Sequence, residues 1–258
     1  MLGMNTQADH FPDSKLPRIT ASFWVMKIAA TTLGETAGDL VSMTMKVGYA
    51  ISSLVLMSAF LVSLLSQLVV KQYRPWLYWT VILTTSTAGT TMSDYMDRSL
   101  GLGYARGVAV LVTILLCVFA AWRLSTGSLS VDHVKTRKAE VFYWITILFS
   151  NTLGTALGDF LADSSGLGFA GGALLIGGLL AAVLATTFFT RVSRILLFWI
   201  AFVLTRPFGA TVGDVLTKSK QKGGLDFGTV GSSAILGAVL VALVVWSTLK
   251  ERRARAEA

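Results

Sequence analysis

The chain has 258 residues, of which 53% are hydrophobic and 14% are charged, and its formal net charge is +8. Soluble globular chains carry about 25% charged residues, so this composition excludes an ordinary soluble domain and indicates a multi-pass membrane protein. Basic residues that flank membrane helices account for the positive charge, and we therefore expect no nucleic-acid partner.

The N-terminal residues 1–18 are polar and lack the apolar core and cleavage site of a signal peptide, so we expect a cytoplasmic tail. Blocks of about 20 apolar residues, the length that crosses a bilayer, follow. They predict an all-α membrane protein with eight spanning helices, at residues 20–44, 49–70, 76–97, 104–123, 140–162, 168–189, 194–216 and 227–248. A basic cytoplasmic tail, residues 250–258, ends the chain.

The helices form four tandem two-helix repeats, because four segments align without gaps: "FWVMKIAATTLGETAGD", "YWTVILTTSTAGTTMSD", "YWITILFSNTLGTALGD" and "FWIAFVLTRPFGATVGD". Each has an aromatic residue, a marker tryptophan, a glycine ten residues later and an aspartate fifteen residues later. An even number of helices per repeat makes the repeats parallel. We assign the repeats to residues 19–71, 72–124, 139–190 and 191–249. The polar loop 125–138 leaves two arrangements open, a pseudo-fourfold bundle or two four-helix halves.

Loop charges predict the orientation. Fourteen Lys and Arg residues fall on the side of the two termini and six on the other side. The positive-inside rule then places both termini in the cytoplasm, in a bacterial inner membrane. The marker tryptophans would lie near the cytoplasmic interface, where anchoring in an aromatic belt is their expected role.

A polar stripe runs along one face of each odd-numbered helix, seven, eleven and fifteen residues after the marker tryptophan, because residues four apart share a face. It consists of Thr31, Glu35, Asp39, Ser86, Thr90, Asp94, Asn151, Thr155, Asp159, Arg206, Ala210 and Asp214. An ionised carboxylate near the bilayer centre costs about 2.5–3.5 kcal/mol. We therefore expect the stripe to face the bundle interior, around a central cavity.

Four aspartates and one glutamate in this stripe predict a cation site. Against Lys27 and Arg206, the two cations expected inside the membrane away from its surfaces, the five carboxylates leave a formal charge of −3. Oxygen ligands suit hard cations such as Mg²⁺, Ca²⁺ or Mn²⁺. Carboxylates this close share protons that a bound cation would release.

The predicted metal ligands are Asp39, Asp94, Asp159, Asp214 and Glu35, supported by Thr31, Ser86, Thr90, Asn151, Thr155, Arg206 and Lys27. The alternatives are that these groups form a packing network between helices or lie solvated at the outer interface.

Other features carry smaller expectations. Pro207 should kink or unwind its helix, and the glycine ten residues after each tryptophan should allow close helix packing. Arg98, Asp97 and Asp163 should be solvated at the outer mouth. The single cysteine excludes an internal disulfide, and both histidines, His10 and His133, lie outside the apolar blocks, which excludes a histidine metal site or Ser-His-Asp triad in the membrane.

The Trp-Gly-Asp pattern resembles a bacterial integral-membrane family built of four tandem two-helix repeats of unknown function, each with a hallmark tryptophan. The resemblance covers about residues 20–250 and is carried by Trp24, Trp79, Trp144 and Trp199. Members of this family are often labelled uncharacterised membrane-anchored proteins, so the resemblance implies a fold and no activity.

We expect a transporter, in its simplest form a proton-coupled exporter of a hard metal ion (Mn-, Mg- or Ca-like, or trivalent). The alternatives are a cation channel with an aspartate ring and a non-transporting membrane scaffold. We expect no enzymatic activity, because the sequence offers no nucleophile–base pair. We also expect no cofactor besides a bound or transported cation. The expected partners are the lipid bilayer and the cation or proton, and a homo-oligomer is left open.

Overall fold

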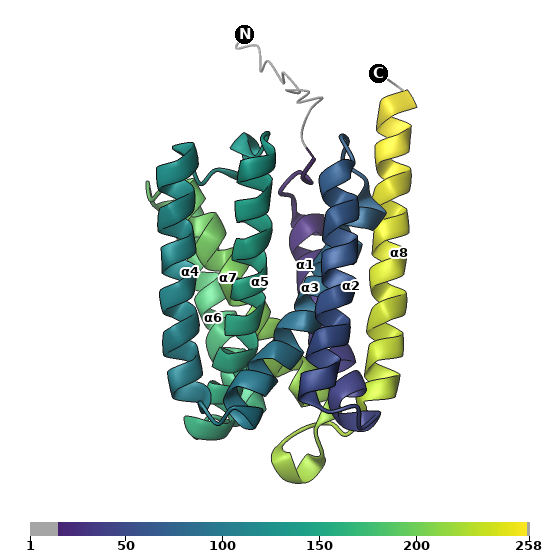
Figure 1. Ribbon diagram of the computed structural model, residues 1–258, viewed down its shortest axis with the longest axis vertical. Helices are drawn as coiled ribbons and strands as arrows, with labels where there is room; N and C mark the ends of the chain where they lie inside the picture. The colour runs from purple at the N-terminus through teal and green to yellow at the C-terminus, as the bar shows by residue number, and fades with distance from the viewer. Residues whose placement is uncertain (1–14, 257–258) are drawn as a thin grey trace.

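The computed structural model describes residues 15–256, with side chains described as far as residue 250. Most of the predicted N-terminal tail, including His10, lies outside this part. The described chain contains eight α-helices, α1 (Ala21–Asp39), α2 (Tyr49–Val69), α3 (Pro75–Asp94), α4 (Tyr104–Thr126), α5 (Arg137–Asp159), α6 (Gly168–Phe189), α7 (Arg194–Thr217) and α8 (Thr229–Ala256). The beginning of α1 and the end of α8 lie at the same end of the bundle (Figure 1).

Six of these helices, α2 and α4 to α8, are long and apolar enough to cross a membrane. This finding indicates a multi-pass membrane protein. The other two, α1 and α3, are among the four helices that carry the polar stripe, and neighbouring helices cover them inside the bundle.

The inner helices α1, α3, α5 and α7 form a closed ring, in which each packs against the next and α7 packs against α1. The glycine ten residues after each marker tryptophan makes the contact. A Cβ atom added to it would overlap the stripe residue at position seven of the following repeat, in the pairs Gly34–Ser86, Gly89–Asn151, Gly154–Arg206 and Gly209–Thr31. The close-packing role predicted for these glycines is confirmed.

Aromatic rings close one end of this ring of helices. The residue before each marker tryptophan contacts the marker tryptophan of the next repeat, with centroid separations of 5.7 Å for Phe23–Trp79, 5.5 Å for Tyr78–Trp144, 6.1 Å for Tyr143–Trp199 and 5.7 Å for Phe198–Trp24. Trp79, Trp144 and Trp199 are buried, whereas Trp24 is half-buried. The belt role predicted for the tryptophans is therefore wrong for these three, because their rings pack between helices.

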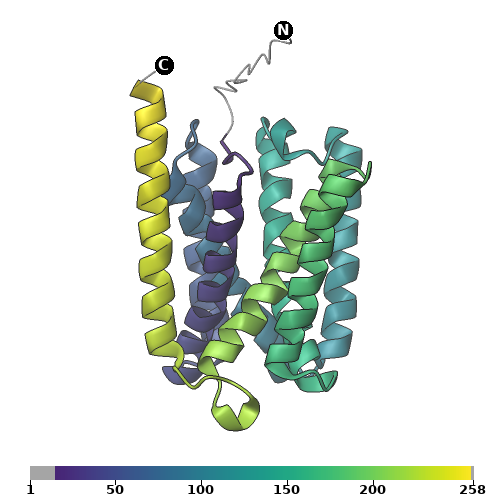
Figure 2. The same cartoon turned by 180° about the vertical axis from the view of Figure 1, so that it is seen from behind.

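The outer helices follow the same cyclic rule. Each packs on the inner helix of the following repeat: α2 on α3, α4 on α5, α6 on α7, and α8 on α1. Figure 2 shows the last of these pairs, with α8 alongside α1. Large apolar side chains such as Leu54, Val62 and Leu174 are exposed on the outer helices, as surfaces that face lipid require.

The ends of the inner helices differ. Three of them continue past the repeat aspartate into a π-helical turn, at Leu40–Thr44, Tyr95–Ser99 and Phe160–Ser164. The fourth, α7, stays α-helical through Pro207 and ends at Thr217 without such a turn. The expected unwinding at Pro207 is wrong, because a proline removes only one donor and the packed neighbours hold the rest of the helix in place.

Candidate functional site

All twelve side chains of the polar stripe lie inside the ring of inner helices, and none is more than 5% exposed. This burial follows from the four-residue spacing, which keeps the stripe on the face that each inner helix turns toward the others. It rules out the alternative in which the aspartates are solvated at an interface.

One ion pair joins all four repeats at the middle of the stripe. Arg206 Nη2 lies 2.9 Å from Glu35 Oε2. It also donates hydrogen bonds to the hydroxyls of Thr90 at 2.6 Å and Thr155 at 2.7 Å. Those hydroxyls in turn donate to Glu35 Oε2 at 3.3 and 3.1 Å. The two residues that break the repeat pattern, Glu35 and Arg206, are thus each other's partners.

The four aspartates lie one turn further along the inner helices. Two cations each form salt bridges with two of these aspartates, an arrangement that we call a clamp. Arg98 contacts Asp94 at 2.9 Å and Asp159 at 3.0 Å. Each clamping cation comes four residues after the aspartate of its own repeat and also reaches the aspartate of the following repeat.

Lys218 forms the second clamp, 2.7 Å from Asp39 and 3.1 Å from Asp214. Burial lowers the pKa of the Lys218 ammonium, but the charges of Asp214 and Asp39 raise it by more, so its pKa lies above the ordinary value. Lys218 therefore stays charged at neutral pH.

These clamps correct the predicted charge of the site. Arg98 and Lys218 join Lys27 and Arg206, so four cations face the five carboxylates and the fully ionised set carries a formal charge of −1. The prediction that Arg98 is simply solvated is wrong. Asp97, only 5% exposed, also departs from that expectation, whereas Asp163 is exposed as expected. The four-residue spacing from Asp to Arg or Lys was the available signal.

Three of the five predicted ligands come together. Glu35, Asp39 and Asp214 are buried, and each can offer one carboxylate oxygen such that all three oxygens lie within 4.8 Å of one another. Oxygen ligands lie about 2.3–2.6 Å from Ca²⁺, so two ligands of one ion are at most about 5.2 Å apart, and the limit of 4.8 Å is compatible with a shared ion of this size. Asp214 Oδ1 faces Lys218 at 3.1 Å, whereas Asp214 Oδ2 has no hydrogen-bond donor, which leaves its lone pairs available. Asp94 and Asp159 belong instead to the Arg98 clamp.

A cavity of about 250 Å³ opens beside this cluster, lined among others by Asp39, Asp159, Asp163, Arg98 and Lys218. It gives the acidic end of the ring a polar entrance. The opposite end of the ring is filled by the aromatic contacts.

The four repeats of the chain match the family model described as Repeat of Unknown Function (DUF347), at residues 22–73, 77–128, 142–193 and 197–253. The chain belongs to this family. No curated protein and no solved structure matches the chain. Family membership confirms the fourfold repeat and assigns no activity.

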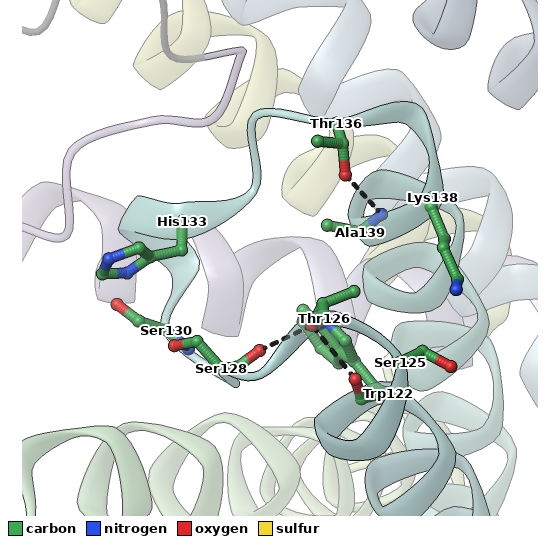
Figure 3. Close-up of a pocket in the computed structure, with 9 residues that line it drawn as sticks. All are labelled: Trp122, Ser125, Thr126, Ser128, Ser130, His133, Thr136, Lys138 and Ala139. Atoms are coloured by element: carbon green, nitrogen blue, oxygen red, sulfur yellow. Dashed lines mark hydrogen bonds between the residues drawn. The ribbon is translucent and has the colours of Figure 1, made fainter.

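The loop between α4 and α5 and the adjoining helix ends form another cavity of about 340 Å³ (Figure 3). Its hydroxyls are largely engaged locally. Thr126 donates to the carbonyls of Trp122 and Ser128, each at 3.0 Å, and Thr136 accepts from the backbone N–H of Ala139 at 3.2 Å. The lining includes His133 and Lys138 but no carboxylate, so this cavity adds nothing to the cation site.

Buried polar groups without partners mark the stretch between the aromatic end and the Arg206–Glu35 pair. The Lys27 ammonium is fully buried, lies 4.0 Å from the ring centroid of Phe202 and has no hydrogen-bond acceptor. Both side-chain polar atoms of Asn151 and the hydroxyl of Ser86 are likewise unpartnered. Polar groups of this kind are the usual hosts of buried water.

Proposed function

We propose that this DUF347 protein crosses the membrane eight times with both termini in the cytoplasm, and that it exchanges a hard cation for protons along the axis of its inner ring. The excess of Lys and Arg in the loops on the side of the termini supports the orientation. The polar helices α1 and α3 fit an eight-span arrangement, because the other helices cover them and they need not face lipid.

The observation that carries the proposal is the buried cluster of the carboxylates of Glu35, Asp39 and Asp214, in which Asp214 Oδ2 has no hydrogen-bond donor. Carboxylates inside a membrane protein are energetically costly and commonly mark a pathway for ions or protons. Their oxygens fit a hard cation such as Mn²⁺, Mg²⁺ or Ca²⁺.

In this proposal, the Lys218 ammonium balances the charge of the carboxylates when no substrate cation is bound. Its side chain is 20% exposed and lies at the polar cavity, so it can swing outward when an ion arrives. The incoming cation then takes over the charge of Lys218 at Asp39 and Asp214. When the ion leaves toward the other side, protons or Lys218 again balance the carboxylates.

Arg206 lies between this cluster and the aromatic end and is paired with Glu35 of the cluster, which favours a transporter over an open channel. A cation cannot pass a fully buried guanidinium without a rearrangement that separates the pair. Such a step couples ion movement to a conformational change, as alternating access requires.

Flux of Mn²⁺ into proteoliposomes against a pH gradient tests the proposal. We expect saturable uptake that Asp39→Asn, Asp214→Asn and Glu35→Gln abolish, while the exposed loop variant Asp132→Asn leaves it unchanged. Persistence of flux in the Asp39→Asn/Asp214→Asn double variant would overturn the site, and current that does not saturate would indicate a channel.

A structural scaffold is the second candidate, supported by the fact that each of the five carboxylates has a cationic partner. A scaffold predicts no flux of Mn²⁺, Mg²⁺ or Ca²⁺ in the wild type, together with a loss of folded protein in the same variants. Measurement of flux and of thermal stability on the same preparations separates the two candidates.

A further inference from the structure

An apolar groove of about 650 Å³ runs along the outside of the bundle between α1, α6 and α7. Its walls include Trp24 and Ile28 of α1, Leu180 and Leu184 of α6, and Phe198 of α7. Figure 2 shows these three helices on the side that faces the viewer. Its volume falls within the range of about 300–1,000 Å³ found for ligand sites.

The groove exists because α6 carries smaller side chains at positions where α4, the outer helix of the second repeat, carries large ones. The large side chains of α4 fill the equivalent space beside α7, which we call the filled corner. The position 43 residues after the marker tryptophan is Trp122 in α4 and Thr187 in α6. Trp122 is 1% exposed and its ring lies 5.5 Å from that of Trp199. In α2 the same position is Gln67, also 1% exposed.

The position three residues earlier repeats this difference. It is Phe119 in α4, whose ring lies 5.1 Å from that of Trp199, and Leu184 in α6, which is 59% exposed. Trp24 lies in the groove and is consequently the one half-buried marker tryptophan. The open corner beside α6 thus differs from the filled corner beside α4.

Positive charge marks one end of this groove. Arg194 lines it at the beginning of α7, and the Arg194 guanidinium donates to the backbone carbonyl of Thr187. Arg191 in the preceding loop and Arg18, next to the lining residue Ile19, are both exposed. No carboxylate lines the groove.

We infer that this groove binds one anionic phospholipid, whose acyl chain lies against Trp24, Leu184 and Phe198 and whose phosphate pairs with Arg194. An apolar channel with a basic rim matches both parts of such a molecule, and juxtamembrane Arg and Lys residues attract anionic head groups. The guanidinium fork suits the phosphate oxygens. The inference does not depend on ion transport.

Binding of phosphatidylglycerol and phosphatidylcholine to the full chain in detergent, followed by native mass spectrometry and thermal unfolding, tests the inference. We expect the wild type to retain phosphatidylglycerol preferentially and to be stabilised by it. Arg194→Gln should bind phosphatidylglycerol about fivefold more weakly and lose the preference. Arg123→Gln is the matched control, because Arg123 is exposed at the end of α4 beside the filled corner and also donates to a backbone carbonyl. It should behave as the wild type.

Thr187→Trp copies the filled corner into α6. It should abolish lipid retention and raise the unfolding temperature measured without lipid. Ala181→Phe, which fills the groove from another position, replaces it if Thr187→Trp does not fold. Equal retention of both lipids by the wild type, or undiminished phosphatidylglycerol binding in a filled variant, would overturn the inference. So would a dimer that the filled variants abolish, because it would identify a second copy as the occupant.

Discussion

The two halves of the inner ring obey different symmetries. In the half that contains the marker tryptophans (the aromatic half), the same contact recurs at all four interfaces between neighbouring inner helices, which we call seams. These contacts run from Phe23–Trp79 round to Phe198–Trp24. In the acidic half, all four repeats supply an aspartate, but only the second and fourth supply the clamping cations Arg98 and Lys218. The aromatic packing is therefore fourfold, whereas the salt bridges of the aspartates are twofold.

This difference teaches what each half does for the molecule. Identical aromatic contacts stabilise the assembly of the repeats, and any repeat can supply them. Charge is not repeated in this way, because the four aspartates share two cations and Glu35 and Arg206 each occur in one repeat only. Departures from the repeat therefore mark the half that carries the proposed cation site, and substitutions that remove them test the comparison most directly.

Arg206→Ala should have the largest effect. It leaves Glu35 buried without its counter-ion, and breaking a buried ion pair costs about 3–5 kcal/mol. We expect a large loss of folded protein, measured by fluorescence-detected size exclusion after heating. The exposed variant Arg123→Ala should change stability little. If Arg206→Ala melts as the wild type does, the central pair is not a stabilising feature of the ring.

Lys218→Met should come next. It removes the cation between Asp39 and Asp214, and hydrogen bonds to charged groups contribute about 1.5–3 kcal/mol. The loss should stay below that of Arg206→Ala, because water from the polar cavity can reach the freed carboxylates. Lys222→Met is the control, since Lys222 lines the same cavity but is exposed. Equal melting temperatures for the two variants would contradict the clamp.

Gly209→Ala probes the seam between α7 and α1. The new methyl group would overlap Thr31, and overpacking of this kind costs about 1–3 kcal/mol. Gly178→Ala is the matched control, because a Cβ atom there meets nothing within 4 Å and alanine favours a helix by up to about 1 kcal/mol. Opposite shifts in thermal stability are expected, and a neutral Gly209→Ala would argue against close packing at the seam.

Tyr78→Phe should have the smallest effect, since it removes one hydrogen bond of the aromatic half and keeps the ring. Tyr78 and Tyr143 share a buried bond of 2.6 Å between their hydroxyls, and such a bond contributes about 0.5–1.5 kcal/mol. A double-mutant cycle with Tyr143→Phe measures the coupling. Strictly additive losses would show that the two hydroxyls act independently.

Most of the architecture was predictable from the sequence, because spacing carried it. The invariant Trp-Gly-Asp intervals predicted the helices and the repeats, and the four-residue spacing predicted that the stripe is buried. The pairing of Glu35 with Arg206 was accessible for the same reason, since the two were the only symmetry-breaking charges of the stripe.

The rest depended on partners that spacing within one helix does not identify. From the sequence alone, Trp144 is expected to anchor a helix at the membrane interface, because its contact with the preceding repeat is not visible in the sequence. Lys218 and Arg98 lie just outside the predicted helices, in segments expected to be loops. Their long side chains extend back to the aspartates inside the ring. The separation of the five carboxylates into one group of three and the Arg98 clamp likewise follows only from the three-dimensional closure of the ring.

Closure of the ring also means that the covalent order of the repeats is arbitrary. The seam between α7 and α1 uses the same glycine contact as the other three, although no peptide links those two helices. A circular permutant that begins within the loop 125–138 should therefore assemble the same bundle. A half-length chain, by contrast, would separate Glu35 from Arg206, so two half chains would have to pair before either could neutralise its own buried charge.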